Sequence, residues 1–289
     1  MNKSFQEIFM QSRFKKLVLI VLIYPFTMIL LNPLSAKTLI VSDIDDTIKM
    51  TDILGAKVKV AVSPFFEVKA FAGMNSLYEN LLNEETKIYY ISGSPQYIRN
   101  NVENYLSSHH FPQFKNLILR TNLSDDIFKV KYYAITKLIS EEKPDKVLFI
   151  GDDTEYDPEV YEQLSLENPG LVNGIYIRSV QNRYIGHLEG VKSFFAPLEI
   201  ALAEIKDLNL SPDKVNAIAQ DFLKDLTSEN LAIAYRYCPV LGSRELSKQV
   251  QNPELVEYKE LITATQEKIQ ETCLQKKKSE EVPKVNNLE

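Results

Sequence analysis

A pair of carboxylates, Asp43 and Asp45, follows a short apolar run in the sequence DIDDT. At the end of a strand both side chains can reach one crevice, where one can bind a hard cation and attack phosphorus while the other protonates a leaving oxygen. Because a phosphate monoester is dianionic, a carboxylate nucleophile needs a metal ion to offset the repulsion. The motif alone is weak, since acidic turns that cap helices or face solvent are commoner than active sites.

A hydroxyl group lies in a similar place after a second apolar run. Ser92 ends this run and is followed by Gly93, Ser94 and Pro95. A hydroxyl beside free backbone N–H groups at the start of a helix suits a phosphoryl oxygen, so Ser92 and Gly93 are candidate substrate-binding residues. The ordinary interpretation of such a serine is an N-cap for the next helix, and both interpretations stay open at this point.

Acidic residues and a lysine complete the candidate set. The sequence GDDTEYD, residues 151–157, follows a third apolar run and offers several carboxylates to Mg²⁺ or its bound waters. Magnesium prefers oxygen ligands and keeps several waters, so one or two direct carboxylates are enough. Lys131, near the start of a predicted helix, could neutralise a nucleophile and a phosphoryl group together. Lys129 competes for this role, and a surface lysine is the usual alternative.

The elements that must position these residues alternate between strands and helices. The apolar runs predict strands at 38–41, 87–92, 117–119, 147–150 and 173–177, and helical spacing predicts helices at 74–82, 96–106, 129–139 and 159–166. This alternation indicates an α/β fold, a parallel sheet with helices on both faces. Ligands of such sheets bind beyond the carboxyl ends of the strands. Asp43, Ser92 and Asp152 each fall at a predicted strand end, so we expect them to converge on one crevice.

The C-terminal part of the chain is predicted to be helical and contains no residue set that looks catalytic. Apolar residues recur at helical spacing in three segments, 201–210, 215–226 and 254–269. Ser211 or Asp213 is the expected cap of the second helix and Pro253 the expected start of the third. These patterns predict a catalytic domain over 37–197, a helical extension over 198–275 and a disordered polar tail over 276–289.

The N-terminal segment has the pattern of a secretory signal. Basic residues precede an apolar run over 17–31, which is followed by a proline and by small residues up to Ala36. We therefore predict a signal peptide over residues 1–36 and an exported protein, periplasmic or secreted, with an uncleaved membrane anchor as the alternative. Export would permit a disulfide between Cys238 and Cys273, and two buried thiols are the alternative.

The overall charge narrows the class of partner. The chain carries a net charge of −6. This acidic balance argues against a nucleic-acid partner, because phosphate backbones demand clustered positive charge. It provides no general attraction to anionic membranes either. A phosphorylated substrate is the partner that the candidate residues indicate.

The four motifs, in this order and at successive strand ends, resemble the haloacid dehalogenase superfamily and imply its Rossmann-like fold. DIDDT matches the first motif, Ser92 the second, Lys131 the third and GDDTEYD the fourth. The resemblance implies that Asp43 is the nucleophile and that Asp45 is the general acid and then the base that hydrolyses an aspartyl-phosphate.

The same resemblance implies a metal site and a phosphate site. Mg²⁺ would be held by Asp43, the backbone carbonyl of Asp45, and Asp152, with Asp157 assisting through water. Thr47 would join Ser92 and Gly93 in binding the substrate. Dehalogenase chemistry itself is disfavoured, since it needs neither the proton transfer nor the metal for which these acids provide.

A narrower resemblance covers about residues 38–195. The segments SDIDDTIKMTD, FAGMNSLYENL, YYISGSPQYI, FIGDDTEYDPEVY and IYIRSV are similar to the catalytic domain of the actin-patch phosphatidate phosphatase family. The resemblance implies hydrolysis of phosphatidate to diacylglycerol and phosphate, with a lipid phosphate at a membrane interface as substrate. Gln96 stands where the family usually has an aromatic residue, which affects lipid preference, and Asp153 replaces a customary serine.

Two questions stay open from the sequence. The first two motifs are too close for a large cap domain, so 53–71 is predicted to be a flap with Lys57, Lys59, Phe65 and Phe66 near the opening; packing of the two phenylalanines on the sheet is the alternative. For function, the alternatives are an exported phosphatase for soluble phosphomonoesters or phosphoproteins, and a non-catalytic binding or host-interaction protein on the same fold.

Overall fold

Six strands form one parallel sheet in the part of the chain that the computed structural model describes, residues 37–51, 69–183, 185–227 and 244–281. Their spatial order is β3-β2-β1-β4-β5-β6. The strands are β1 Thr38–Ser42, β2 Thr86–Pro95, β3 Leu117–Arg120, β4 Lys146–Asp152, β5 Val172–Arg178 and β6 Val191–Phe194. Every neighbouring pair runs parallel. This confirms the predicted α/β fold and adds β6, which the sequence pattern did not predict.

The strand that carries the first motif lies inside the sheet and is covered on both faces. β1 pairs with β2 on one side and with β4 on the other. All five of its residues are buried, with Ile40 in one hydrophobic cluster and Leu39 and Val41 in another. A strand covered on both faces needs a continuous apolar run rather than an alternating one, which is the pattern TLIVS has.

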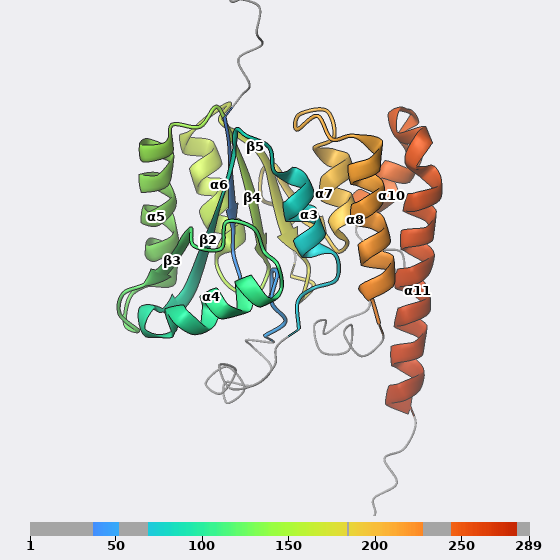
Figure 1. Cartoon of the computed structure of the whole chain (residues 1–289), viewed down its shortest axis with the longest axis horizontal. Helices are drawn as coiled ribbons and strands as arrows, with labels where there is room; N and C mark the ends of the chain where they lie inside the picture. The colour runs from blue at the N-terminus through green and yellow to red at the C-terminus, as the bar shows by residue number, and fades with distance from the viewer. Residues whose placement is uncertain (1–36, 52–68, 184, 228–243, 282–289) are drawn as a thin grey trace, which may run out of the picture. The chain divides into compact units, whose positions relative to one another are not determined.

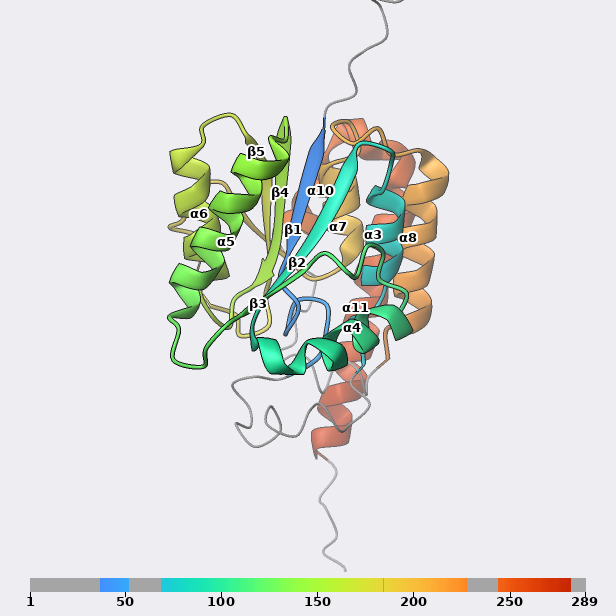
Figure 2. The same cartoon turned by 60° about the vertical axis from the view of Figure 1, so that its left-hand side comes forward.

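Helices lie in layers on the two faces of the sheet (Figures 1 and 2). On one face lie α5 Ile127–Glu142 and α6 Asp157–Glu167; on the other lie α3 Met74–Leu81, α7 Pro197–Ala203 and α8 Pro212–Asp225. Farther out on the second side are α10 Arg244–Gln251, η3 Pro253–Tyr258 and α11 Lys259–Glu281. η2 Gln96–Ile98 and α4 Arg99–Ser108 lie at the end of the sheet where the parallel strands finish. The expected helices on both faces and the expected C-terminal helices are confirmed.

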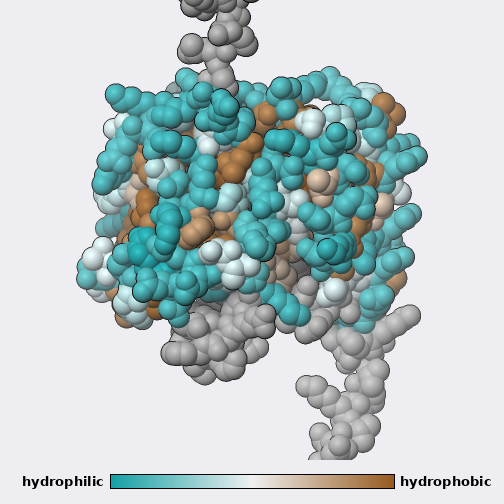
Figure 3. Space-filling view, in the orientation of Figure 1, coloured by the Kyte–Doolittle hydropathy of each residue, from teal (hydrophilic) through white to brown (hydrophobic). Residues whose placement is uncertain are grey.

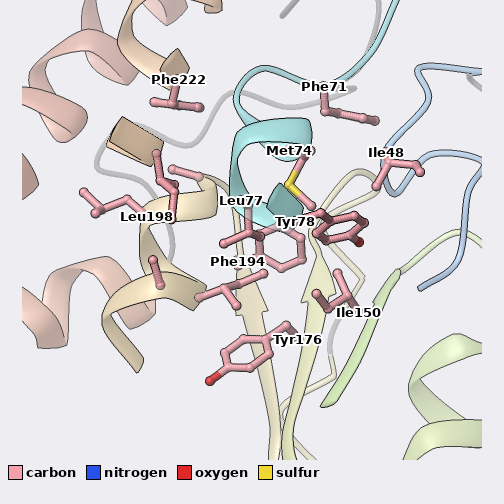
Figure 4. Packing of buried hydrophobic residues seen from close by; sticks show 14 of the residues in the cluster. Ile48, Phe71, Met74, Leu77, Tyr78, Ile150, Tyr176, Phe194, Leu198 and Phe222 are labelled. Atoms are coloured by element: carbon pink, nitrogen blue, oxygen red, sulfur yellow. The ribbon is translucent and has the colours of Figure 1, made fainter. Parts of the chain in front are cut away.

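The larger part of the hydrophobic core lies on the face of the sheet that α3, α7 and α8 cover. Figure 4 shows Met74, Leu77 and Tyr78 of α3 among side chains from the sheet and from the helices that follow it. Phe194 of β6 and Phe222 of α8 belong to the same buried cluster. Burial of such side chains contributes about 1.5–3 kcal/mol each, so this layer holds the helices on the sheet.

The C-terminal helices share this core with the strands. Ile40 of β1, Leu198 of α7, Ile218 of α8 and Ile269 of α11 are members of one buried cluster. Residues 37–289 accordingly group as a single unit. The predicted boundary at residue 197, between a catalytic domain and a helical extension, stays a prediction. The hydrophobic core continues across this boundary.

Local capping explains where the helix ends differ from the sequence pattern. The helix expected at 201–210 is α7, which begins earlier, because Pro197 occupies its first turn and the Glu199 carboxylate accepts from the backbone N–H groups of Phe195 and Ala196. Ser211 caps α8, accepting from Lys214 N at 3.4 Å. Pro253 begins the short helix η3, and a separate helix, α11, follows it.

Several predictions fall on residues outside the described part of the chain. They concern the signal peptide, most of the flap at 53–71 with its lysines and phenylalanines, the end of the C-terminal tail, and Cys238. Cys273 is described and is buried in α11. Among the described residues, no helix combines the length and the apolar character that a bilayer-spanning segment needs.

Candidate active site

The carboxyl ends of β1, β2 and β4 bring the predicted residues together. Asp43 follows β1 directly, and its backbone N–H donates to the carbonyl of Ile150 in β4 at 2.9 Å. Ser92 lies near the end of β2, and Asp152 is the last residue of β4. The convergence expected from the parallel sheet is therefore present in the structure.

Asp43, the candidate nucleophile, is buried, and a hydrogen bond holds one of its two carboxylate oxygens. Asp43 is 3% exposed, and its Oδ1 accepts from Lys131 Nζ at 2.8 Å. Its Oδ2 is also buried and has no hydrogen-bond partner among the residues that the structure describes. Leaving a buried carboxylate oxygen without a partner costs free energy, so this atom is held ready for an electrophile or a cation.

The structure distinguishes the two candidate lysines. Lys131 is buried and donates to both Asp43 and Asp157, whereas the Lys129 side chain is exposed. Burial alone would lower the pKa of Lys131, but Asp157 and Asp43 outweigh this and raise it well above the usual value. The Lys131 ammonium therefore stays charged beside the nucleophile.

Three buried carboxylates form a cluster that fits a hard cation. Oxygen atoms of Asp43, Asp152 and Asp157 all lie within 4.8 Å of one another. Burial, followed by the repulsion between these carboxylates, raises the pKa of Asp152 well above its usual value. One ammonium, that of Lys131, faces the three acids, so excess negative charge remains. The unpartnered Oδ2 of Asp43 and this all-oxygen set are what a divalent cation requires.

Neighbouring hydroxyl groups orient the metal-site carboxylates. Asp152 accepts from Thr47 Oγ1 at 3.0 Å through one oxygen and from Thr154 N at 2.7 Å through the other. Asp157 Oδ2 accepts from Asp152 N at 3.3 Å. The Thr47 hydroxyl thus holds Asp152 in place, and its predicted contact with substrate stays a prediction.

Asp45, the proposed acid and base, is held by donors from two elements. Its Oδ2 accepts from Ser92 Oγ at 3.0 Å and from Ser94 Oγ at 3.1 Å. Its Oδ1 lies 3.4 Å from Lys49 Nζ. Ser92 therefore orients Asp45. Its predicted contact with a phosphoryl oxygen, together with Gly93, stays a prediction. Ser94 and Lys49 were missed by sequence reasoning, although both lie inside the quoted motifs SGSP and DIDDTIK.

A buried arginine fixes the loop that carries these residues. Arg178, the last residue of β5, donates to the carbonyls of Thr47 and Phe195, each at 2.8 Å. Its guanidinium lies over the rings of Phe71 and Phe194, at 4.1 and 4.5 Å from their centroids. Sequence reasoning did not select Arg178; the available signal was a basic residue inside the apolar strand IYIRSV.

Residues 38–179 match a family model described as the catalytic domain of phosphatidate phosphatase APP1. This segment belongs to that family. The match confirms the resemblance inferred from the motifs.

Two curated relatives cover the same part of the chain. An uncharacterized protein of Schizosaccharomyces pombe is 23% identical over 159 residues, which is 52% of this chain and 26% of that protein. Phosphatidate phosphatase APP1 of Saccharomyces cerevisiae is 26% identical over 153 residues, 50% of this chain and 26% of the relative. The chain thus matches about a quarter of the length of these relatives.

Among solved structures, two crystal structures of a class C acid phosphatase from Bacillus anthracis are similar. The first has a TM-score of 0.35 and 19% identity, covering 70% of this chain and 85% of that one. The second has a TM-score of 0.34 and 17% identity, covering 68% and 84%.

The two departures from the family pattern have different structural consequences. Asp153 is buried, and its carboxylate accepts from the backbone N–H groups of Val180, Gln181 and Arg183 at 2.8–2.9 Å. It therefore ties the loop after β5 to the fourth motif and leaves Asp152 free for the metal site. Gln96 is exposed and directly follows the turn Ser92–Pro95.

Glu155 reaches across the site from the fourth motif. A Cβ atom placed on Gly93 would lie 3.5 Å from Glu155 Oε2 and 3.4 Å from Ile127, so the loop closes on this glycine. Burial raises the pKa of Glu155 and the Lys131 ammonium opposes that shift. A lone glutamate within GDDTEYD gave no sequence signal that it faces Gly93 rather than solvent.

Proposed function

We propose that this protein is a magnesium-dependent phosphatase that forms an aspartyl-phosphate on Asp43 and hydrolyses phosphatidate to diacylglycerol and phosphate. The observation that carries the proposal is the buried Oδ2 of Asp43, which has no hydrogen-bond partner among the described residues. The other oxygen of this carboxylate is held by the Lys131 ammonium, and Asp43 belongs to the acidic cluster. A structural carboxylate has its oxygens satisfied, whereas a nucleophile needs one oxygen free for phosphorus.

The first half of the reaction uses groups already in position. Asp43 Oδ2 attacks phosphorus, and the bond from phosphorus to the leaving oxygen breaks. Asp45 gives its proton to that oxygen while Ser92 and Ser94 hold the carboxyl group. Lys131 offsets part of the negative charge throughout. Asp43, Asp152 and Asp157 would hold Mg²⁺, which supplies charge neutralisation of the phosphoryl group when bound.

In the second half Asp45, now a carboxylate, takes a proton from water. The resulting hydroxide attacks phosphorus and displaces the Asp43 carboxylate, so the enzyme returns to its starting state and phosphate leaves. Asp45 thus acts as the general acid in the first step and as the general base in the second, as expected for a two-step hydrolysis through a covalent intermediate.

Support for phosphatidate as the substrate comes from the comparisons. The family match and the name of the yeast relative both refer to phosphatidate. Export through residues 1–36 is part of the same proposal and places the activity outside the cytoplasm. Soluble phosphomonoesters or phosphoproteins are the competing substrates.

The test is phosphate release by the purified chain from phosphatidate in mixed micelles, with Mg²⁺ or with chelator, beside a panel of water-soluble phosphomonoesters. We expect metal-dependent turnover that is fastest with phosphatidate. Higher kcat/KM for a soluble ester would replace the substrate assignment. Equal turnover by wild type and Asp43→Asn on every substrate would remove the enzyme assignment. For export, the N-terminal sequence of protein recovered outside the cytoplasm should begin at Lys37.

A further inference from the structure

Exposed aromatic and apolar side chains lie around the end of the sheet that holds the active site. Tyr97, in η2 after β2, is 77% exposed; Leu123, in the loop after β3, is 60% exposed; and Tyr156, after β4, is 51% exposed. Phe128, in the first turn of α5, is half-buried against the core and contacts Tyr156 edge to face with ring centroids 6.2 Å apart. We call these four residues the aromatic rim.

The aromatic rim and the active site lie on the same edge of the sheet. Strands β2, β3 and β4 are parallel to β1, so the loops that follow them project from the edge at which Asp43 lies. Tyr156 directly precedes the metal-site residue Asp157, and Tyr97 follows closely on the turn of Ser92–Pro95. A surface that meets this edge therefore meets the rim and the site together.

The rim side chains are presented by ordered loops. Arg120 Nη1 donates to the carbonyl of Leu123 at 3.0 Å, which fixes the loop after β3. The Asp126 side chain caps α5 by accepting from Lys129 N at 3.0 Å. In the view of Figure 3 the described surface is mostly hydrophilic, with hydrophobic residues in small separate areas. Among the described residues, seven large hydrophobic side chains are exposed, and three of them, Tyr97, Leu123 and Tyr156, lie at this one edge. Such a concentration at one edge indicates a binding surface.

We propose that the aromatic rim inserts into the surface of a lipid bilayer and thereby places Asp43 at the membrane–water interface. This inference rests on the proposed function, because a phosphate ester that belongs to a lipid is presented at that interface. Tyrosine has an apolar ring and a polar tip and favours the headgroup level of membranes. Two of the four rim residues are tyrosines that are more than half exposed.

The charge of the rim loops indicates whether electrostatic attraction or apolar burial would attach the protein to a bilayer. The rim loops carry both signs, with Arg120 and Lys129 offset by Asp125, Asp126 and Glu155, and the whole chain has a net charge of −6. Such a surface gains no net attraction to an anionic membrane. Attachment must therefore come from apolar burial, and it should change little with salt, whereas electrostatic attachment would be screened.

The sequence offers a direct probe, because the chain contains no tryptophan. A Leu123→Trp variant of the full chain would carry one fluorophore on the rim. Leu166→Trp is the matched control, since Leu166 is also 60% exposed but lies near the C-terminal end of α6, away from the site edge. We expect vesicles of phosphatidylcholine with phosphatidate to shift the tryptophan emission of the rim variant to the blue and brominated lipids to quench it, with no change for the control.

Loss of rim side chains gives the second measurement. For Tyr97→Ser combined with Leu123→Ser we expect vesicle binding in a flotation assay to fall on the order of 100-fold, because each side chain contributes about tenfold or more. Turnover of a short-chain, water-soluble phosphatidate should stay within about twofold of wild type. Val256→Ser, at an exposed apolar residue of η3, should leave both properties unchanged.

The outcomes separate this inference from the proposed function. Vesicle binding by wild type that the double variant keeps, or an unshifted emission from the Leu123→Trp variant, would overturn the rim as a membrane surface. Concentration-dependent self-association that the double variant abolishes would assign the rim to a second copy of the chain instead. Rim-dependent vesicle binding without phosphatidate hydrolysis would sustain the inference and overturn the substrate. Hydrolysis of phosphatidate in micelles without vesicle binding would overturn the inference and sustain the proposed function.

Discussion

Two buried carboxylates, those of Asp43 and Glu204, show what distinguishes the proposed nucleophile from a structural acid in this protein. Glu204 is 1% exposed, and its two oxygens accept from Tyr176 OH at 2.5 Å and from Asn173 Nδ2. Asp43 is 3% exposed, and within the described part of the chain one of its oxygens has a partner while the other has none. Burial raises the pKa of both groups. Burial is therefore common to the two, and the unfilled acceptor marks the reactive one.

The largest effect should come from the nucleophile. Asp43→Asn removes the attacking oxygen, so we expect kcat to fall on the order of 10⁴-fold or more, with a free energy of unfolding within about 1 kcal/mol of wild type or higher. Glu204→Gln is the matched change and should keep kcat within about twofold. It should lose about 1–3 kcal/mol of stability in urea unfolding, because an acceptor of Tyr176 or Asn173 is lost. A large loss of kcat in Glu204→Gln together with unchanged kcat in Asp43→Asn would contradict the comparison.

Next comes the cation that makes the Asp43 site possible. Lys131→Met leaves Asp43 and Asp157 buried without their ammonium, so we expect about 3–5 kcal/mol of lost stability and a large loss of turnover. Thermal unfolding with and without Mg²⁺ measures the first and phosphate release the second. The exposed neighbour gives the control: Lys129→Met should change stability by no more than about 0.5 kcal/mol. Equal effects of the two changes would contradict the placement of Lys131.

The role of Asp45 predicts a dependence on the leaving group. Asp45→Asn should lower kcat by about 10²–10⁴-fold on an alkyl phosphate, whose leaving oxygen needs a proton. The loss should be smaller for an aryl phosphate such as p-nitrophenyl phosphate in a burst or single-turnover measurement, because that leaving group departs without protonation. An equal loss in the first step on both substrates would assign Asp45 to orientation alone.

The smallest expected effect is in the pH dependence of stability. Burial raises the pKa of Glu204 above its usual value of 4.5, so the native state binds this proton more tightly than the unfolded state does. The contribution of Glu204 to stability is thus most favourable below pH 4.5 and declines as pH rises through its native pKa. The stability of wild type relative to Glu204→Gln should fall across that window when unfolding is followed at several pH values. A difference that is independent of pH would show that Glu204 titrates normally.

Site residues that lie at the end of their own strand could be predicted from the sequence. Asp43, Ser92 and Asp152 each follow an apolar run, and parallel strands bring their ends to one edge, so their convergence was predictable. Lys131 could have been chosen over Lys129 on helical periodicity, because Lys131 lies on the buried face of α5 with Ile135 and Leu138.

The missed features depend on contacts between distant segments. Arg178 donates to the carbonyls of Thr47 and Phe195, and Glu155 lies beside Gly93 of another strand end. β6, Val191–Phe194, has four residues with a partly exposed first half, so its sequence lacks the apolar run of a central strand. Periodicity within one segment carries no information on such partners, which only the packed fold brings together.

Arg178 also decides how large a piece of the chain must fold for the site to exist. Its side chain links Thr47 of the first motif to Phe195 just before α7, and its carbonyl accepts from Asp153 N at 3.1 Å. A polypeptide ending at residue 179 would contain every family motif but would leave this buried guanidinium without its Phe195 acceptor and without the ring of Phe194. The C-terminal helices, which contain no candidate catalytic residue, therefore fold together with the strands that position Asp43. A mutation in the core of these helices should make the active-site loops less ordered.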